Sequence, residues 1–447
     1  MDRPSNTLPA FTGQVQPFRL PENFLPYTSN VHRSLLRRAC YQRGLAVRVI
    51  EGDDERWIAS SATRSVRFYR NMPPSTTQAA LRIAYNKHLT KSRLDQAGIP
   101  VPAGIVIASD ETAKAAEWYD AQGGRPVVVK PVSGYGGRGV SSGIADKADF
   151  LDAIRHAGSD RVIVETHVSG ADHRLFVVGG RFVAAVRRHP ATVVGDGQSS
   201  IEELVEARNR VRRKLPYIRD SLVKFDDQTA HLLALAGLDR TSIPAKGEAI
   251  TLKRVANVSM GGDSEDVTEM VHPDFRAIAE RCWRAIPELT FCGIDMMAED
   301  ITRPASGQSH GVIEINPNCD LAVHLFTTLD RGGLPVDVAG AVIDYIFPDL
   351  PAPEAATEEF LISGLVQGVG FRAWLRGEAA LLGVSGECMN LPDGRVRAVV
   401  QGSRTALDEL ATRCAIGPKN AQPTYVDRAP HPAISGHGMT IVAAPRG

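Results

Sequence analysis

The sequence has few cysteines, and their positions form no structural pattern. Six cysteines are scattered over 447 residues, with no C-x-x-C pair among them. This spacing argues against both a disulfide framework and a zinc site, and it is typical of reduced thiols. We therefore expect a cytoplasmic protein.

The sequence also lacks a bias toward one charge and a long apolar run. It has 51 Lys and Arg residues against 51 Asp and Glu residues, so the formal net charge is zero. Without clustered basic residues, nucleic acid is not an expected partner. No apolar run approaches the roughly 18 residues of a membrane-spanning helix, so a membrane is not an expected partner either. Residues 1–30 are polar and proline-dotted, which predicts a polar arm rather than a signal peptide.

Helical and strand patterns alternate along the rest of the chain. His32–Gly44 predicts an amphipathic helix, and Thr77–Gly98 predicts a single helix that ends at glycine. Two apolar runs around Gly179 and Gly180 predict a β-hairpin. A proline-rich and acidic stretch, PDLPAPEAATEE, marks a linker. The predicted units are an arm (1–30), an N-terminal α/β subdomain (31–106), the main α/β region (107–347), a linker (348–358) and a C-terminal domain (359–447).

The C-terminal region has the pattern of a small, separate domain. Its order is strand, loop, helix, strand, turn, strand, helix and strand. That order predicts a split βαβ, ferredoxin-like sheet covered by two helices. The expected fold class is therefore α/β followed by α+β.

A lysine before a glycine-rich loop is the first candidate for a binding site. Lys130 lies in the predicted strand RPVVVKPV, and the loop SGYGGRG follows directly. Glycines let backbone N–H groups approach a polyanion, and the lysine would add charge against phosphate. Such a loop alone is weak evidence, because a lysine at a strand end can instead reach solvent. The loop glycines are Gly134, Gly136, Gly137 and Gly139.

Acidic and amide side chains within two late apolar strands are the second candidate. Glu314 and Asn316 in GVIEIN are two residues apart, so they project from one strand face, and Asp295 lies within FCGIDMMA. Acidic groups in buried strands need a counter-charge or a metal. Oxygen donors of this kind suit Mg²⁺. Buried ion pairs with Lys or Arg are the alternative, and the residues alone leave both open.

The order of these motifs resembles the ATP-grasp family. The matching pieces run from about Thr76 to Phe347 and include YNKHLTKSRLDQAGIPVP, VVVKPVSGYGGRGV, VIVETHVSGADHRLFVVGGRFVAA, LKRVANVSMGGDSEDVT and GVIEINPNCDLAVHL. They are most similar to the ATP-grasp parts of cyanophycin synthetase and of bifunctional glutathione synthetase. The resemblance implies the ATP-grasp fold, with ATP and Mg²⁺ as cofactors.

The resemblance also implies residue roles. Lys87, Lys130 and the glycines of the loop, among them Gly136, Gly137 and Gly139, would hold the phosphates. Glu165 and Val168 would present their backbone to adenine, and Asp172 would reach the ribose. Arg254 would meet the transferring phosphoryl group, while Asp295, Glu314 and Asn316 would hold Mg²⁺. His173 and Arg174 would orient the substrate, and Gly261 and Gly262 would offer N–H donors from a loop that closes over the intermediate.

The sequence departs from these relatives in its extent. It contains no G-x-x-x-x-G-K-[ST] motif for a second nucleotide site, and it has no room for a glutamate–cysteine ligase half. A protein with a single ATP site is expected to form a single type of bond. The resemblance implies small-molecule carboxylate and amine substrates without identifying them, and it leaves a homo-oligomer open.

The stretch GLVQGVGFRAWL, Gly364–Leu375, predicts a loop that binds an anion at a helix N-terminus. An ordinary strand–helix turn with a surface arginine is the alternative. From Glu359 to about Asp427 the sequence resembles acylphosphatase, with Cys388 and Met389 departing from its usual pattern. The resemblance implies that Arg372 binds phosphate and that Asn390 orients the attacking water.

Together these patterns predict an ADP-forming carboxylate–amine ligase that works through an acyl phosphate on amino acids or small peptides, joined to an acylphosphatase. A net ATPase with the two sites in series and a non-catalytic nucleotide sensor are the alternatives. The C-terminal domain could clear stray acyl phosphates, act on a separate acyl phosphate, or serve only as a docking surface.

Overall fold

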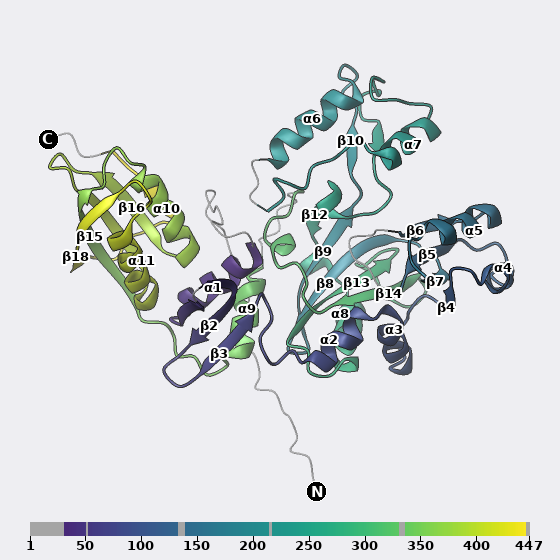
Figure 1. Cartoon of the computed structure of the whole chain (residues 1–447), viewed down its shortest axis with the longest axis horizontal. Coiled ribbons are helices and arrows are strands. Elements are labelled where there is room, and N and C mark those ends of the chain that lie inside the picture. The colour runs from purple at the N-terminus through teal and green to yellow at the C-terminus, as the bar shows by residue number, and fades with distance from the viewer. Residues whose placement is uncertain (1–30, 51, 133–138, 214–216, 330–335, 444–447) are drawn as a thin grey trace, which may run out of the picture.

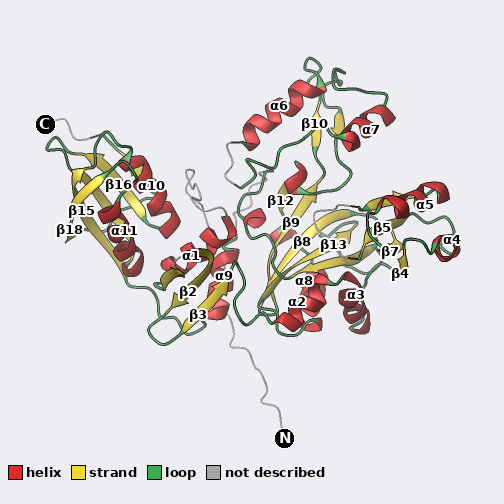
Figure 2. Cartoon of the chain, in the orientation of Figure 1, coloured by secondary structure: helices red, strands yellow, loops and turns green. Residues whose placement is uncertain are grey.

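A computed structural model describes residues 31–50, 52–132, 139–213, 217–329 and 336–443 of the 447-residue chain. Figure 1 shows the C-terminal domain on one side of helix α1 and the larger α/β region on the other. Figure 2 shows that sheets with helices packed on their faces recur in each part. None of the helices in these ranges is long and apolar enough to cross a bilayer.

The first unit is a three-stranded antiparallel sheet of order β1-β2-β3. Its core contains Trp57, which is fully buried and stacks on Phe68 with 4.0 Å between ring centroids. Helix α9, from far along the chain, shares this core with α1. The elements are α1 (Val31–Gln42), β1 (Ala46–Ile50), β2 (Asp53–Ser60), β3 (Ser65–Tyr69) and α9 (Val338–Ile346).

The second unit is a four-stranded antiparallel sheet of order β4-β7-β5-β6, with α4 and α5 packed against it. Its first strand crosses the boundary expected at residue 106, so the predicted N-terminal subdomain does not end where the sequence suggested. The elements are β4 (Gly104–Ala108), α4 (Thr112–Asp120), β5 (Val127–Pro131), β6 (Ser141–Ile144), α5 (Lys147–His156) and β7 (Arg161–Thr166).

The third unit is the main sheet, of order β12-β9-β8-β13-β14. Apolar residues of α2, α3 and α8 pack on one face of it and form a single core. The β8–β9 hairpin turns at Gly179 and Gly180, as predicted. The elements are α2 (Gln78–Tyr85), α3 (Lys87–Gln96), β8 (Ala171–Val178), β9 (Arg181–His189), η1 (Val258–Met260), β12 (Asp263–Asp266), η2 (Thr268–Met270), α8 (Pro273–Ala285), β13 (Phe291–Ala298), β14 (His310–Asn316) and η3 (Ala322–His324).

The single helix predicted over Thr77–Gly98 is wrong, because the structure has two helices. Asn86 has an extended backbone (φ −96°, ψ 102°), and its side chain accepts hydrogen bonds from the N–H groups of His88 and Leu89. An asparagine side chain that caps a new helix interrupts the preceding one. As a result, Lys87 is the first residue of α3.

A small fourth unit lies over the end of the main sheet. Helices α6 and α7 pack around the two-stranded sheet β10-β11 and enclose a separate apolar core. Figure 1 shows this unit extending from β9 and β12. The elements are β10 (Thr192–Val194), α6 (Ile201–Arg212), α7 (Asp227–Leu235) and β11 (Ala249–Thr251).

The C-terminal domain has the predicted split βαβ order, with a sheet of order β18-β15-β17-β16-β19. Strand β19 adds an edge, parallel to β16, that the sequence did not predict. The linker predicted over residues 348–358 is too long at its C-terminal end, since β15 begins at Ala355. The elements are β15 (Ala355–Leu365), α10 (Phe371–Leu382), β16 (Ser385–Asn390), β17 (Val396–Ser403), α11 (Arg404–Ile416), β18 (Gln422–Pro430) and β19 (Met439–Ile441).

Helix α1 joins the C-terminal domain to the rest of the molecule. Tyr41 is 4% exposed and belongs to the C-terminal core. The Ser403 hydroxyl donates to the Tyr41 carbonyl, and Thr405 Oγ1 donates to the Gly44 carbonyl at 3.0 Å. A Cβ on Gly383 would lie 2.4 Å from Gln42 Cγ. These contacts make α1 a shared element of both parts.

Candidate active site

A cavity of about 700 Å³ is lined by residues of the four-stranded sheet, the main sheet and the loop after β11. Part of its lining is apolar and close-packed. A Cβ on Gly311 would lie 3.3 Å from Val168 Cγ2 and 3.8 Å from Pro102 Cδ, and Gly311 pairs with Met297. Val128 of β5 also contributes to the lining. This end of the cavity suits a flat, weakly polar ring.

A β-bulge sets the boundary between this apolar lining and the charged lining. Asp295 pairs with Glu314 but Met296 pairs with Val312, so Ile313 is the extra residue of β14. A bulge re-aims side chains along a strand. Both Ile313 and Glu314 therefore line the cavity although they are adjacent in sequence.

The predicted metal-binding residues converge in the charged part. Asn316 Nδ2 lies 3.0 Å from Glu314 Oε1 and 3.3 Å from Asp295 Oδ2. Within the described residues, no cluster of three His, Cys, Asp or Glu side chains could hold a metal. The set here is two carboxylates and an amide, whose oxygen donors fit Mg²⁺ when phosphate oxygens complete the shell.

Two arginines neutralise Asp295, as the ion-pair alternative required. Arg174 Nε and Nη2 lie 2.7 and 2.9 Å from the two oxygens of Asp295, and Arg188 Nη2 lies 3.1 Å from Oδ2. Burial alone would raise the pKa of Asp295, but the two guanidinium groups hold that pKa below its usual range. Gly293 leaves room for this arrangement, because a Cβ there would lie 3.3 Å from Arg174 Cδ. Asp295 is therefore the carboxylate that both interpretations involve: it is a candidate Mg²⁺ ligand, and it forms ion pairs with two arginines.

Two lysines bind a buried glutamate on the other side of the cavity, and a third lies against Glu314. Glu165 is 2% exposed and accepts from Lys130 Nζ at 2.6 Å and from Lys91 Nζ. Lys87 Nζ lies 3.5 Å from Glu314 Oε2. Lys91 was not predicted, although its i+4 spacing from Lys87 on one helix was a usable signal.

Burial shapes the titration of this lysine cluster. It lowers the pKa of Lys91 to about 6, and the charges of Lys130 and Lys87 act in the same direction. It lowers the pKa of Lys130 to about 8, with Glu314 opposing the shift. A polyanion in the cavity would therefore meet amines that are only partly protonated at neutral pH.

The loop after β11 supplies another side of the cavity. Arg254 lines it, with Asn257 and Ser259 further along the loop. Arg254 is exposed to the cavity rather than buried in the fold. It lies in the same cavity as the predicted phosphate-binding and metal-binding residues.

Several predicted residues lie differently from what the resemblance implied. Asp172 is held by Arg188 at 2.6 Å, so its carboxylate already has a partner. His173 is 2% exposed on the opposite face of β8 from Arg174, and burial lowers its pKa to about 4. His173 therefore belongs to the core behind the sheet and not to the cavity lining.

The predicted loop glycines also need correction. The N–H of Gly261 donates to the Val258 carbonyl at 3.2 Å, and that of Gly262 donates to the Asn257 carbonyl at 3.0 Å. Neither N–H is available as a donor to an intermediate. Gly139 has φ +68°, and a Cβ there would lie 2.4 Å from the Ala157 carbonyl oxygen. Gly136 and Gly137 lie outside the described residues.

Cys319 lies close to the charged lining but has no sign of reactivity. Its side chain is 3% exposed, and burial raises the pKa of its thiol to about 12. A thiol that stays protonated is a poor nucleophile. All six cysteines are buried free thiols, as the scattered spacing predicted.

The second predicted site lies where β15 leads into α10. Gly368 and Gly370 have φ of +74° and +79°, and no side chain in the described part of the chain caps the N-terminus of α10. Arg372 lies in the first turn of this helix, and Cys388 Sγ lies 4.0 Å from its carbonyl. Asn390, two residues further along β16, has a buried Oδ1 without a hydrogen-bond partner among the described residues. Free N–H groups, a guanidinium and an unsatisfied amide are together suited to an anion and a water molecule.

Both sites fall within regions that match known domain families. Residues 84–199 match the RimK-like ATP-grasp domain, and residues 358–435 match acylphosphatase. The chain therefore carries an ATP-grasp domain followed by a C-terminal acylphosphatase domain.

The ATP-grasp part is related to cyanophycin synthetase and to the glutathione biosynthesis bifunctional protein GshAB. The chain is 35% identical over 288 residues to cyanophycin synthetase of Trichormus variabilis, covering 63% of this chain and 31% of that protein. It is 32% identical over 321 residues to GshAB of Mannheimia succiniciproducens, covering 69% of this chain and 41% of that protein. The chain thus spans only about a third of the length of the curated relatives it matches first.

A solved structure supports the same relationship. The chain is 29% identical to a bifunctional glutathione synthetase from Pasteurella multocida, with a TM-score of 0.53. The similarity covers 70% of this chain and 43% of that chain.

Proposed function

We propose that this protein is an ADP-forming carboxylate–amine ligase that forms an amide bond between amino acid or small peptide substrates through an acyl phosphate. One observation carries this proposal. A single cavity joins an apolar lining, a lysine cluster and a convergent set of oxygen donors. That combination suits a nucleotide whose base, phosphates and divalent cation need three different environments.

The residues divide the work of holding ATP. The backbone of Glu165 and Val168 would face adenine, and Val128, Met297 and Ile313 would pack against the ring. Lys87 and Lys130 would hold the phosphates. Asp172 would reach the ribose only by leaving Arg188.

Mg²⁺ would be held by Asp295, Glu314 and Asn316, where it would neutralise charge on the transferring phosphoryl group. For this role Asp295 must turn from Arg174 and Arg188 toward the cation. That change would leave the Arg174 guanidinium available to an anionic substrate group in the same cavity, while Arg188 would keep its ion pair with Asp172.

The reaction itself needs positioning more than covalent participation by the protein. A carboxylate oxygen of the acid attacks the γ-phosphorus, the bond to the β-phosphate oxygen breaks, and ADP leaves. The amine nitrogen then attacks the acyl carbon, the amide forms, and phosphate leaves with one carboxylate oxygen. Arg254 would stabilise the transferring phosphoryl group, and Arg174 would orient the acyl group.

The C-terminal domain would hydrolyse acyl phosphates. The N-terminus of α10 and Arg372 would bind the phosphate, and Asn390 would orient the attacking water through its unsatisfied Oδ1. Its target is either the acyl phosphate of the ligase or a separate acyl phosphate.

The test is a screen with Mg·ATP and an equimolar mixture of the twenty protein amino acids, with ADP release and product mass read together. A ligase gives an amide and ADP release that depends on the amine. A net ATPase gives ADP without amide, and a nucleotide sensor binds ATP without turnover. Either of the last two results would overturn the proposed function.

A further inference from the structure

The buried face of helix α6 is apolar near its N-terminus and polar near its C-terminus. Ile201 and Val205 are buried one turn apart, and the same face continues with Arg208, Asn209 and Arg212. Arg212 is 3% exposed and Asn209 is 5% exposed. Buried polar side chains need partners, so this end of α6 must contact polar groups of another segment.

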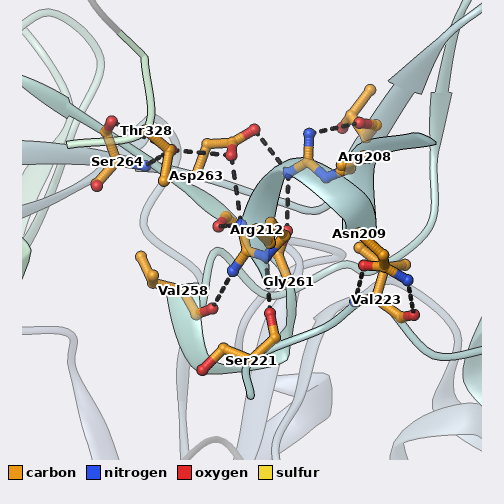
Figure 3. A network of polar contacts seen from close by, with 12 residues as sticks. Arg208, Asn209, Arg212, Ser221, Val223, Val258, Gly261, Asp263, Ser264 and Thr328 are labelled. Atoms are coloured by element: carbon orange, nitrogen blue, oxygen red, sulfur yellow. Dashed lines mark hydrogen bonds and ion pairs between the residues drawn. The ribbon is translucent and has the colours of Figure 1, made fainter. Parts of the chain in front are cut away.

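Those partners are backbone carbonyls of the loop beside the cavity (Figure 3). Arg212 Nη2 donates to the Val258 carbonyl at 2.8 Å, and its Nη1 donates to the Gly262 carbonyl at 3.0 Å. Arg208 Nη2 donates to the Gly261 carbonyl at 2.8 Å. Two guanidinium groups thus hold three carbonyls of residues 258–262.

The same loop lines the cavity with its other side. Asn257 and Ser259 contribute to the lining, and Asn257 Oδ1 accepts from the N–H of Ser259 at 3.0 Å. Neither Arg208 nor Arg212 belongs to the lining. The arginines therefore reach the cavity indirectly, through the backbone of this loop, which we call the wall loop (residues 257–262).

A second segment is fixed by the same face of α6. Arg212 Nε donates to the Ser221 carbonyl at 2.7 Å, and the Asn209 amide exchanges two 3.0 Å hydrogen bonds with the backbone of Val223. A Cβ on Gly261 would lie 2.6 Å from Val223 Cγ2, and Gly261 has φ +92°. The wall loop is therefore packed tightly between α6 and residues 221–223.

Asp263 links this arrangement to the main sheet. Its Oδ2 accepts from Arg208 at 2.7 Å, and its Oδ1 accepts from Thr328 Oγ1 at 2.9 Å. Asp263 pairs with His189 at the start of β12. Arg212 donates to neutral carbonyls and also lies 3.7 Å from Asp263 Oδ1; burial lowers its pKa to about 10, with Arg208 acting in the same direction and Asp263 opposing it. Its planar fork of donors suits several carbonyls at once, which a lysine cannot reproduce.

We propose that Arg208 and Arg212 are positioning residues that hold the wall loop against the cavity, and that they thereby determine how much acyl phosphate is captured by the amine rather than by water. The second part of this inference, the partitioning of the acyl phosphate between amine and water, rests on the proposed ligase function. The physical reason is that a fixed wall excludes water from a reactive intermediate, whereas a loosened wall admits it.

The first experiment needs no substrate pair. Hydrogen–deuterium exchange is followed in the full chain with Mg²⁺ and AMPPNP, a non-hydrolysable ATP analogue, at the amides of Met260, Gly261 and Gly262. Arg212→Gln should speed exchange there at least tenfold while AMPPNP affinity changes less than twofold. Arg208→Gln, at a more exposed side chain, should give a smaller increase. Arg210→Gln is the matched control, because Arg210 lies on the exposed face of the same helix.

Unchanged exchange in both variants would overturn the proposal, as would a parallel loss of AMPPNP affinity. If Arg212→Gln does not fold, the exchange measurement is made with Arg208→Gln and Arg212→Lys instead. Arg212→Lys keeps the positive charge but loses the planar fork of donors.

The second experiment measures amide formed per ADP released, with the amino acid mixture and Mg·ATP, in an Asn390→Ala background that removes hydrolysis at the C-terminal site. Arg212→Gln should lower this ratio at least threefold, with an unchanged KM for ATP, and Arg210→Gln should match the parent. An unchanged ratio would overturn the role in partitioning. A parent that forms no amide would instead contradict the ligase proposal, and the exchange experiment would still decide whether the arginines hold the loop.

Discussion

At the scale of single residues, Lys130 is the most exacting test of the phosphate-binding assignment. It is 4% exposed and bound to the buried Glu165, so its loss removes a charge that is fixed at this side of the cavity. We expect Lys130→Ala to lower ADP formation by more than a hundredfold. Turnover within about tenfold of the parent, which is only about 1.4 kcal/mol of barrier, would contradict the assignment. A thermal unfolding curve controls for the loss of the partner of Glu165.

Lys91 and Lys130 also predict a pH dependence of nucleotide binding. Burial lowers the pKa of Lys91 to about 6 and that of Lys130 to about 8 in the free protein. A bound polyanion favours the ammonium forms, so both pKa values should rise on binding and protons should be taken up. The affinity for Mg·ADP should therefore fall from pH 7 to pH 9, by up to about tenfold per pH unit for each proton taken up.

Calorimetry in two buffers of different protonation enthalpy checks this directly. The parent should take up protons at pH 7.5, and Lys91→Met should take up fewer. Proton release, or an affinity that rises with pH, would show that the lysines do not face the phosphates.

At the scale of elements, the break at Asn86 sets where Lys87 lies. Asn86→Ala removes the side-chain cap of α3, which typically costs about 1 kcal/mol of stability. We expect a raised KM for ATP, because Lys87 is the first residue of the freed helix end. Asn86→Asp keeps the cap and should behave like the parent. An Asn86→Ala protein with normal KM would mean that the break does not position Lys87.

This helix break also marks the limit of what the sequence could predict. Apolar periodicity predicted one continuous helix across Asn86, because periodicity does not register a single residue whose side chain caps the next turn. The convergence of Asp295, Glu314 and Asn316 was predictable because these residues lie in two late apolar strands that form a recognisable motif. The bulge at Ile313 and the pairing of Asp172 with Arg188 depend on neighbours distant in sequence, and no local pattern encodes them. The spacing of Lys91 from Lys87 was a local signal, but the contact of Lys91 with Glu165 was not.

At the scale of the whole molecule, α1 ties the C-terminal domain to the rest without placing any predicted catalytic residue in the contact. Arg372 and Asn390 lie on α10 and β16, whereas the contact to α1 runs through Ser403, Thr405 and Gly383. We expect Arg372→Ala and Asn390→Ala to lower hydrolysis of a small acyl phosphate such as acetyl phosphate by about a hundredfold or more. Amide formation by a good substrate pair should survive both changes.

The same variants separate the targets of the C-terminal domain. With a poor amine acceptor, the parent should release more phosphate per amide than Arg372→Ala if the domain clears the ligase's own acyl phosphate. Equal ratios would assign the domain to a separate acyl phosphate. A full chain without any acetyl phosphate hydrolysis would leave only the docking contact through α1.

The most direct measurement of the central claim follows the carboxylate oxygen. Amino acids labelled with ¹⁸O in their carboxylates are incubated with Mg·ATP and the Asn390→Ala protein, and the products are weighed by mass spectrometry. An acyl phosphate route transfers one ¹⁸O to inorganic phosphate for each amide formed, because phosphate leaves with a carboxylate oxygen. Unlabelled phosphate beside a labelled amide, or phosphate release that does not depend on the amine, would contradict the account.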